Sequence, residues 1–285
     1  MHVRNPIEWG VDQLRFAGHA VEAVSRAGHS AREDLHPAVR RIGISDLGYA
    51  LARGIGDFGA FRTDVVFLCV VYPVVGLVLA RLAFGYQMLP LLFPLASGFA
   101  LIGPFAAIGL YEMSRRREQH GDATWADAFA VFRSPALGRV LVMGLLLTAI
   151  FLMWLAAATA IYDVTLGPEP PASLESFLRD VFTTDAGWVM ILAGIGIGFV
   201  FAVIALAIGV VSFPLLLDRQ ARLDTAITTS VRAVLANPGT MAVWGLIVAA
   251  LLVIGSIPLL VGLIVVMPVL GHATWHLYRR VVSPG

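Results

Sequence analysis

Lysine is absent from this sequence, and all 20 basic residues are arginine. Without lysine the chain can form neither a Schiff base with a carbonyl substrate nor the lysine–phosphate contact of a P-loop. Cysteine occurs once, as Cys69 in an apolar run, which excludes an intramolecular disulfide and a multi-cysteine zinc site. We interpret Cys69 as a small apolar core residue.

Charge is also scarce. Only 14% of the 285 residues are charged and 58% are hydrophobic, whereas soluble domains carry about 25% charged residues. The first strongly apolar segment begins near Val65, after an arginine-rich stretch, which is not the layout of a cleavable signal peptide. The composition predicts an all-α polytopic membrane protein with lipid as its main solvent, inserted through internal spans, and no nucleic-acid partner.

The lengths of the apolar segments predict six membrane spans. A hydrocarbon core of about 30 Å needs roughly 20 apolar residues per helix. The last apolar block, about 240 to 278, is too long for one crossing, and the turn-forming Gly255 to Pro258 predicts that it folds back. The predicted spans are about 65–84, 88–111, 140–162, 188–217 and the two halves of 240–278.

The placement of arginine predicts the orientation of these spans. Eighteen of the 20 arginines fall in residues 1–64, 112–139, 218–232 and the C-terminal tail. In contrast, the charged residues of the segment 163–187 are mainly acidic. Cytoplasmic loops retain positive charge, so both termini are expected in the cytoplasm of a bacterium.

An internal repeat groups the spans into three units, each an amphipathic helix at the membrane surface followed by a helical hairpin. The amphipathic stretches share a capping residue near the start and an arginine on the polar face, namely Arg53, Arg133 and Arg232. The predicted organisation is an N-terminal cytoplasmic segment (1–43) and a six-span domain (44–285) with repeats at about 44–117, 122–219 and 222–280.

The N-terminal segment 1–43 spaces apolar residues at helical intervals between Arg and Glu. This pattern predicts an amphipathic helix on the membrane surface or against a partner, and a solvated helix is the alternative.

Several stretches resemble an uncharacterised proteobacterial family of integral membrane proteins. They include LLFPLASGFALIGPFAAIGLYEMSRRRE, VSFPLLLDR and PVLGHATWHLYRR, and the resemblance extends from about Ile44 onward. It implies a bacterial inner-membrane location. Some members of the family carry a provisional label as cytochrome c oxidase components, which points toward respiratory membranes but assigns no residue a role.

His272 and His276 are the histidines closest to a span, and their spacing of four places both rings on one face of a helix. Such a pair can bind haem or a metal, so these two are the candidate cofactor ligands. The preferred interpretation is structural, because both lie near Trp275, Tyr278 and the terminal arginines, in the headgroup region. There a histidine is solvated or bonded to a neighbouring loop. No metal or cofactor is predicted.

Charged residues at the cytoplasmic ends of the even-numbered spans are the candidate contacts for a partner or for anionic lipid. If the repeats pack around one axis, they are expected to meet the arginines of the amphipathic helices in a ring. The alternative is simple positive-inside anchoring with weak surface ion pairs. The residues are Glu112, Arg115, Arg116, Asp218, Arg219, Arg279 and Arg280.

The central parts of all six predicted spans contain no Asp, Glu, Lys, Arg or His. Ion-coupled transporters, pumps and intramembrane enzymes keep such residues at depth, and the common hydrolase, zinc-protease and nucleotide-binding motifs are missing too. No catalytic residue is therefore predicted. The sequence favours a non-catalytic accessory or assembly component of a larger membrane complex, with a respiratory complex as the first candidate. The alternative is a transporter or channel for a neutral or lipid-like solute, built from proline-kinked spans.

Overall fold

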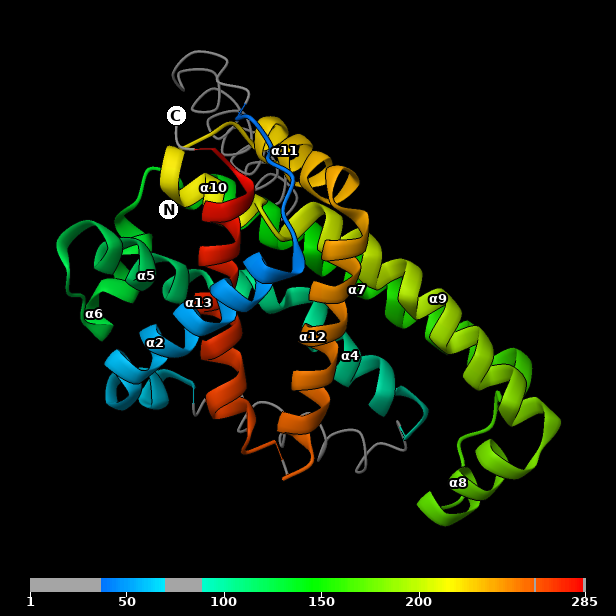
Figure 1. Cartoon of the computed structure of the whole chain (residues 1–285). Coiled ribbons are helices and arrows are strands. Elements are labelled where there is room, and N and C mark those ends of the chain that lie inside the picture. Colours follow the sequence, from blue (N-terminus) through cyan, green and yellow to red (C-terminus); the bar gives the residue numbers. More distant parts are fainter. Residues whose placement is uncertain (1–36, 70–88, 259, 284–285) are drawn as a thin grey trace, which may run out of the picture.

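The computed structural model describes residues 37–69, 89–258 and 260–283 (Figure 1). Within these ranges the regular secondary structure is helical apart from one isolated bridge between Val39 and Val282. The predicted all-α class is confirmed. The helical elements are α2 (Ile44–Cys69), η1 (Leu89–Leu91), α4 (Leu92–Ala106), α5 (Ile108–His120), α6 (Trp125–Ala128), η2 (Phe129–Arg133), α7 (Leu137–Thr165), α8 (Leu174–Thr183), α9 (Asp185–Gly209), α10 (Ser212–Arg219), α11 (Leu223–Ala236), α12 (Pro238–Ser256) and α13 (Leu263–Val281).

Three helical segments of the described chain are long and apolar enough to cross a membrane: α7, the continuous stretch Asp185–Arg219 formed by α9 and α10, and α12. They correspond to the third, fourth and fifth predicted spans. Each presents large apolar side chains outward, and Leu145, Leu192 and Leu246 are each 69% exposed. Such surfaces are costly in water and favourable in lipid.

The other predicted spans differ from the expectation or fall outside the described residues. The second, 88–111, is split among η1, α4 and α5, because the helix breaks at Ala107 shortly after Pro104, a residue that cannot donate a backbone hydrogen bond. The sixth corresponds to α13, which is not among the three helical segments that are both long and apolar enough to cross a membrane. Most of the first, and the whole segment 1–36, lie outside the described residues. Six crossings therefore remain a prediction.

The fourth predicted span also bends, at the junction of α9 and α10. The backbone N–H of Val211 donates to Ser230 Oγ on α11 at 3.1 Å instead of continuing the helical ladder. Pro214 follows and lacks an N–H of its own. A side chain from another helix thus satisfies the backbone group that the break leaves free.

The amphipathic stretches form helices, but of unequal length. The first is continuous with the beginning of the predicted first span, as α2; the second is only α6 and η2; the third is α11. Thr124 caps the second as expected, since its backbone N–H donates to Asp127 Oδ2 at 2.8 Å.

Close helix packing positions α2 against α13, which cross in Figure 1. A Cβ atom added to Gly54 would come within 2.7 Å of the Ala273 backbone N and 2.8 Å of the Val269 carbonyl. The two backbones therefore touch, as helices in membranes do at small residues.

The interior of the described bundle is filled by large side chains. Those that are almost fully buried come from α5, α7, α10, α12 and α13: Tyr111, Trp154, Phe213, Trp244, Trp275 and Tyr278.

Candidate functional site

Four buried polar side chains meet where α2, α5 and α13 pack together. We call Asp57, Ser114, His272 and His276 the Asp57 cluster. They are 4%, 1%, 0% and 6% exposed, respectively. Because buried polar groups are costly unless they bond to one another, their contacts decide what this cluster can do.

Asp57 is the centre of the cluster. Its Oδ2 accepts hydrogen bonds from Ser114 Oγ at 2.6 Å and from His276 Nε2 at 2.8 Å. Its Oδ1 accepts from the guanidinium of Arg117 at 2.8 Å, and that side chain also donates to the Gly56 carbonyl. One carboxylate therefore ties α2 to both α5 and α13.

The hydrogen bonds define the tautomer of His272. Ser114 has one hydroxyl hydrogen and donates it to Asp57, so the contact of 2.8 Å between Ser114 Oγ and His272 Nδ1 requires the imidazole to donate. His272 Nε2 then carries a lone pair, and it is buried without a hydrogen-bond partner. Its ring lies 6.0 Å from the ring of Phe61, between centroids.

Asp57 is held in its charged form. Burial raises its pKa, but the hydrogen bonds from His276 and Ser114 outweigh burial and leave the pKa below its usual value. The guanidinium of Arg117 lies on the outer side of the cluster, 5.4 Å from the centre of the Phe61 ring.

This arrangement does not suit nucleophilic catalysis. A serine nucleophile passes its proton to an imidazole base, whereas Ser114 donates to a carboxylate and accepts from His272. No group of three His, Cys, Asp or Glu side chains in the described part of the chain has a geometry that could hold a metal ion. The cluster instead locks three helices together.

The two histidines were expected to be solvated or bonded to a loop in the headgroup region, and this was wrong. Both are buried, and both bond to helix side chains on α2 and α5. The sequence pattern indicated the histidines but not Asp57 or Ser114. Asp57 is the only acidic residue between Asp46 and Asp64 on an amphipathic helix, and that isolation is the signal that could have found it.

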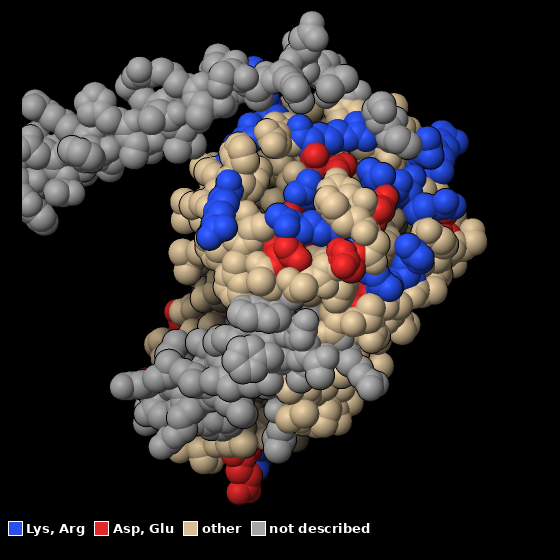
Figure 2. Space-filling model, turned by 90° about the vertical axis from the view of Figure 1, so that its left-hand side faces the viewer, with Lys and Arg blue, Asp and Glu red and all other residues tan. Residues whose placement is uncertain are grey.

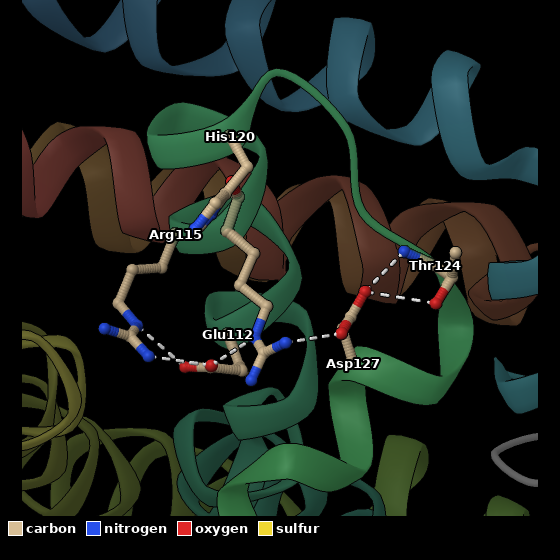
Figure 3. Close-up of polar contacts among 6 residues, drawn as sticks. Glu112, Arg115, His120, Thr124 and Asp127 are labelled. Carbon is tan, nitrogen blue, oxygen red and sulfur yellow. Dashed lines mark hydrogen bonds and ion pairs between the residues drawn. The ribbon is translucent and has the colours of Figure 1, made fainter.

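The predicted rim residues form two further groups, both held by contacts within the chain. In the first, Glu112 is 3% exposed and accepts from Arg115 and Arg116, with three bonds of 2.8 Å (Figure 3). Arg116 also pairs with Asp127 on α6 at 2.6 Å. Asp127 has a lowered pKa, mainly because the backbone N–H of Thr124 donates to it. This group fixes α6 on α5.

The second group joins α5 and α10 to the end of α13. Asp218 accepts from the Tyr278 hydroxyl at 2.7 Å and from Arg279 at 3.4 Å. Arg279 also bonds to Glu118 at 3.0 Å, and Glu118 accepts from Trp275 Nε1 at 3.0 Å.

The remaining two rim residues also have partners within the chain. Arg219 donates to the Ser283 carbonyl, and Arg280 donates to Asp46 at 2.7 Å. Arg280 also lies over the ring of Tyr49.

The arginines of the amphipathic stretches do not complete the expected ring around these carboxylates. Arg53, Arg133 and Arg232 are exposed, and the buried carboxylates bond to other arginines. Arg side chains, with Asp and Glu between them, gather toward one end of the face shown in Figure 2. The positive charge of this face is therefore concentrated at that end of the molecule.

Comparison with known proteins places part of the chain in a family. No curated protein and no solved structure matches the sequence. Residues 91–218, from the 3₁₀ turn η1 to α10, match the family described as predicted integral membrane protein (DUF2189), whose function is unknown. This finding confirms the resemblance over residues 91–218, which are similar to this family of predicted integral membrane proteins.

Proposed function

We propose that the chain is a non-catalytic accessory or assembly component of a larger complex in the bacterial inner membrane, with a respiratory complex as the first candidate. The observation that carries the proposal is the contrast between a filled interior and an exposed apolar flank. Trp154 and Phe213 lie in the interior, whereas Leu192, Phe199 and Val200 of α9 are 54% to 69% exposed.

The polar groups support the same proposal over transport. Within the described helices the buried carboxylates bond to arginine, histidine or serine of the same chain, so they serve packing. A transport pathway needs polar groups directed at a solute, usually where a helix is interrupted. The interruption at Val211 is instead satisfied by Ser230.

The proposed topology has both ends of the chain in the cytoplasm. The described chain begins beside its own C-terminal end, since Arg40 N donates to the Val281 carbonyl at 2.7 Å and Ser283 N donates to the Ala38 carbonyl at 3.0 Å. Two segments that pair this closely lie on one side of a membrane. An even number of crossings between them follows, and six is the number the hydropathy favours.

The threefold repeat forms part of the proposal. In each case the amphipathic helix packs on the end of the unit before it: α6 on α5, α11 on α9 and α10, and α2 on α13. The last contact closes the series from the third unit back to the first. This cyclic arrangement supports three related units around one axis.

Co-purification tests the proposed role. The tagged chain, extracted from its own bacterium in mild detergent, is expected to bring down a stoichiometric membrane partner, identified by mass spectrometry. A tagged, unrelated inner-membrane protein of equal abundance is the control. Recovery of the chain alone would contradict the accessory role, and solute uptake into vesicles containing the purified chain would favour transport.

A matched pair of variants shows whether α9 makes the contact. Replacing Leu192 and Phe199 with alanine changes the exposed flank of α9, whereas replacing Leu145 and Leu152 makes a similar change on α7. Loss of the partner with the α9 pair alone is the expected result.

A further inference from the structure

The short helix α8 connects two membrane-length helices, α7 and α9. It lies at the far end of α7 and α9 from α10 and α11 (Figure 1). Its capping residue Ser173 accepts from the backbone N–H of Ser176 at 3.1 Å, so the helix has a defined start.

One part of the apolar side of α8 fastens it to the bundle. Val181 is 6% exposed, and the ring of Phe177 meets Tyr162 of α7 edge-on at 6.4 Å. Gly187 allows α9 to approach closely, because a Cβ atom there would lie 2.3 Å from the Val181 carbonyl. Tyr162 also donates to the Glu169 carbonyl at 2.6 Å and so holds the connecting loop.

The other part of that apolar side is uncovered. Leu174, Leu178 and Phe182 follow one another at intervals of four, and they are 43%, 45% and 58% exposed. We call these three residues the α8 stripe. Glu175 and Arg179 border the stripe on one side and pair at 2.8 Å, with side chains 84% and 65% exposed. The exposed Asp180 lies on the opposite side of the helix.

We propose that the α8 stripe inserts into the lipid headgroup and upper acyl region, so that α8 lies flat in the membrane surface. Both ends of α8 are fixed at this boundary, because each continues into a helix that crosses the membrane. The chain that follows supports lipid as the occupant, since Trp188 and Val189 at the start of α9 are apolar and 52% and 56% exposed. Tryptophan favours this interfacial depth.

Charge and size also favour lipid over a protein partner. The only basic residue of α8 is already paired with Glu175, and Asp180 and Asp185 add negative charge nearby. Attraction to anionic headgroups is therefore not the cause of binding, and apolar insertion is. Three side chains cover far less area than a stable protein interface, which buries about 800 Å² per partner.

Spin labels on single cysteines test this proposal. The background is Cys69→Ser, which removes the only native thiol, and the pair compared is Leu178→Cys on the stripe and Asp180→Cys on the opposite side of α8. Each labelled protein is reconstituted into vesicles of phosphatidylcholine, with and without phosphatidylglycerol. Collision rates are measured with oxygen, which concentrates in lipid, and with a nickel chelate, which stays in water.

The label at position 178 should have a several-fold higher ratio of oxygen to nickel collisions than the label at 180, in both lipid mixtures. Equal ratios would place the stripe in water, and protection of position 178 from both reagents would place it under protein; either result overturns the proposal. A label at the exposed Leu145 of α7 supplies the lipid reference, and Phe182→Cys replaces Leu178→Cys if that variant does not elute as a single species. The result is independent of the proposed accessory role.

Discussion

At the scale of single residues, Asp57 is the side chain on which the most contacts depend. It bonds to Ser114, His276 and Arg117 at 2.6 to 2.8 Å in a site that water barely reaches. Two of these partners are themselves buried, so removing the carboxylate leaves polar groups without a bond in the interior.

Replacing Asp57 with alanine should therefore destabilise the protein by about 3 kcal/mol, because the buried donors of Ser114 and His276 lose their acceptor. Thermal unfolding in detergent measures the change. Asp122→Ala, at an exposed position, is the matched control and should unfold at the parent temperature. An Asp57→Ala protein as stable as that control would contradict the central position of this carboxylate.

The lowered pKa of Asp57 predicts a dependence of stability on pH. A carboxyl with a folded pKa below its unfolded value, about 4, stabilises the fold fully above that value and loses the contribution as pH falls through the folded pKa. His272 and His276 on α13 and Ser114 and Arg117 on α5 face it. The unfolding temperature should fall below about pH 4, and the Asp57→Asn variant should lack this part of the decrease. If the unfolding temperature fell equally with pH in the parent and in the variant, the result would be inconsistent with a lowered pKa of Asp57.

At the scale of helices, the contact between α2 and α13 depends on backbone approach at Gly54. A Cβ atom there would meet the Ala273 nitrogen at 2.7 Å, a distance that side chains do not tolerate. Gly59, on the same helix, has open space where its Cβ would be. Alanine substitutions at these two glycines therefore distinguish the effect of helix packing on stability from the effect of helix propensity.

Gly54→Ala should lower stability by about 1 to 3 kcal/mol, because the helices must move apart. Gly59→Ala should raise stability by about 0.5 to 1 kcal/mol, because alanine loses less backbone entropy in a helix. Thermal unfolding of both variants in one detergent gives the comparison. A similar gain in both would mean that α2 and α13 do not touch at Gly54.

The helices were predicted from sequence better than their contacts. Apolar length was sufficient for α7, α9 and α12, and Gly255 to Pro258 marked the end of α12 correctly, at Ser256. Prolines inside the spans were expected to kink them, and the second predicted span does divide at Ala107, three residues after Pro104. Asp57 and His276 are 219 positions apart, and nothing in the sequence pattern of α2 indicates that its carboxylate meets α13.

At the scale of the whole molecule, the two ends of the bundle differ in charge and in construction. One end carries the ion pairs of α5, α10 and α13 with the exposed arginines around them, and the other carries α8 with its acidic neighbours. Arginine is retained on the cytoplasmic side, so the first end should face the cytoplasm and α8 the opposite side. The proposed accessory role and the proposed lipid contact of α8 are both compatible with this orientation.

Labelling of single cysteines in intact bacteria with a maleimide that does not cross the inner membrane tests this orientation directly. In the Cys69→Ser background, Glu175→Cys on α8 should react in intact cells, whereas Gln119→Cys on α5 and Ser283→Cys near the C-terminus should react only after the inner membrane is opened. Reaction of position 119 or 283 in intact cells, or protection of position 175 there, would contradict the proposed topology.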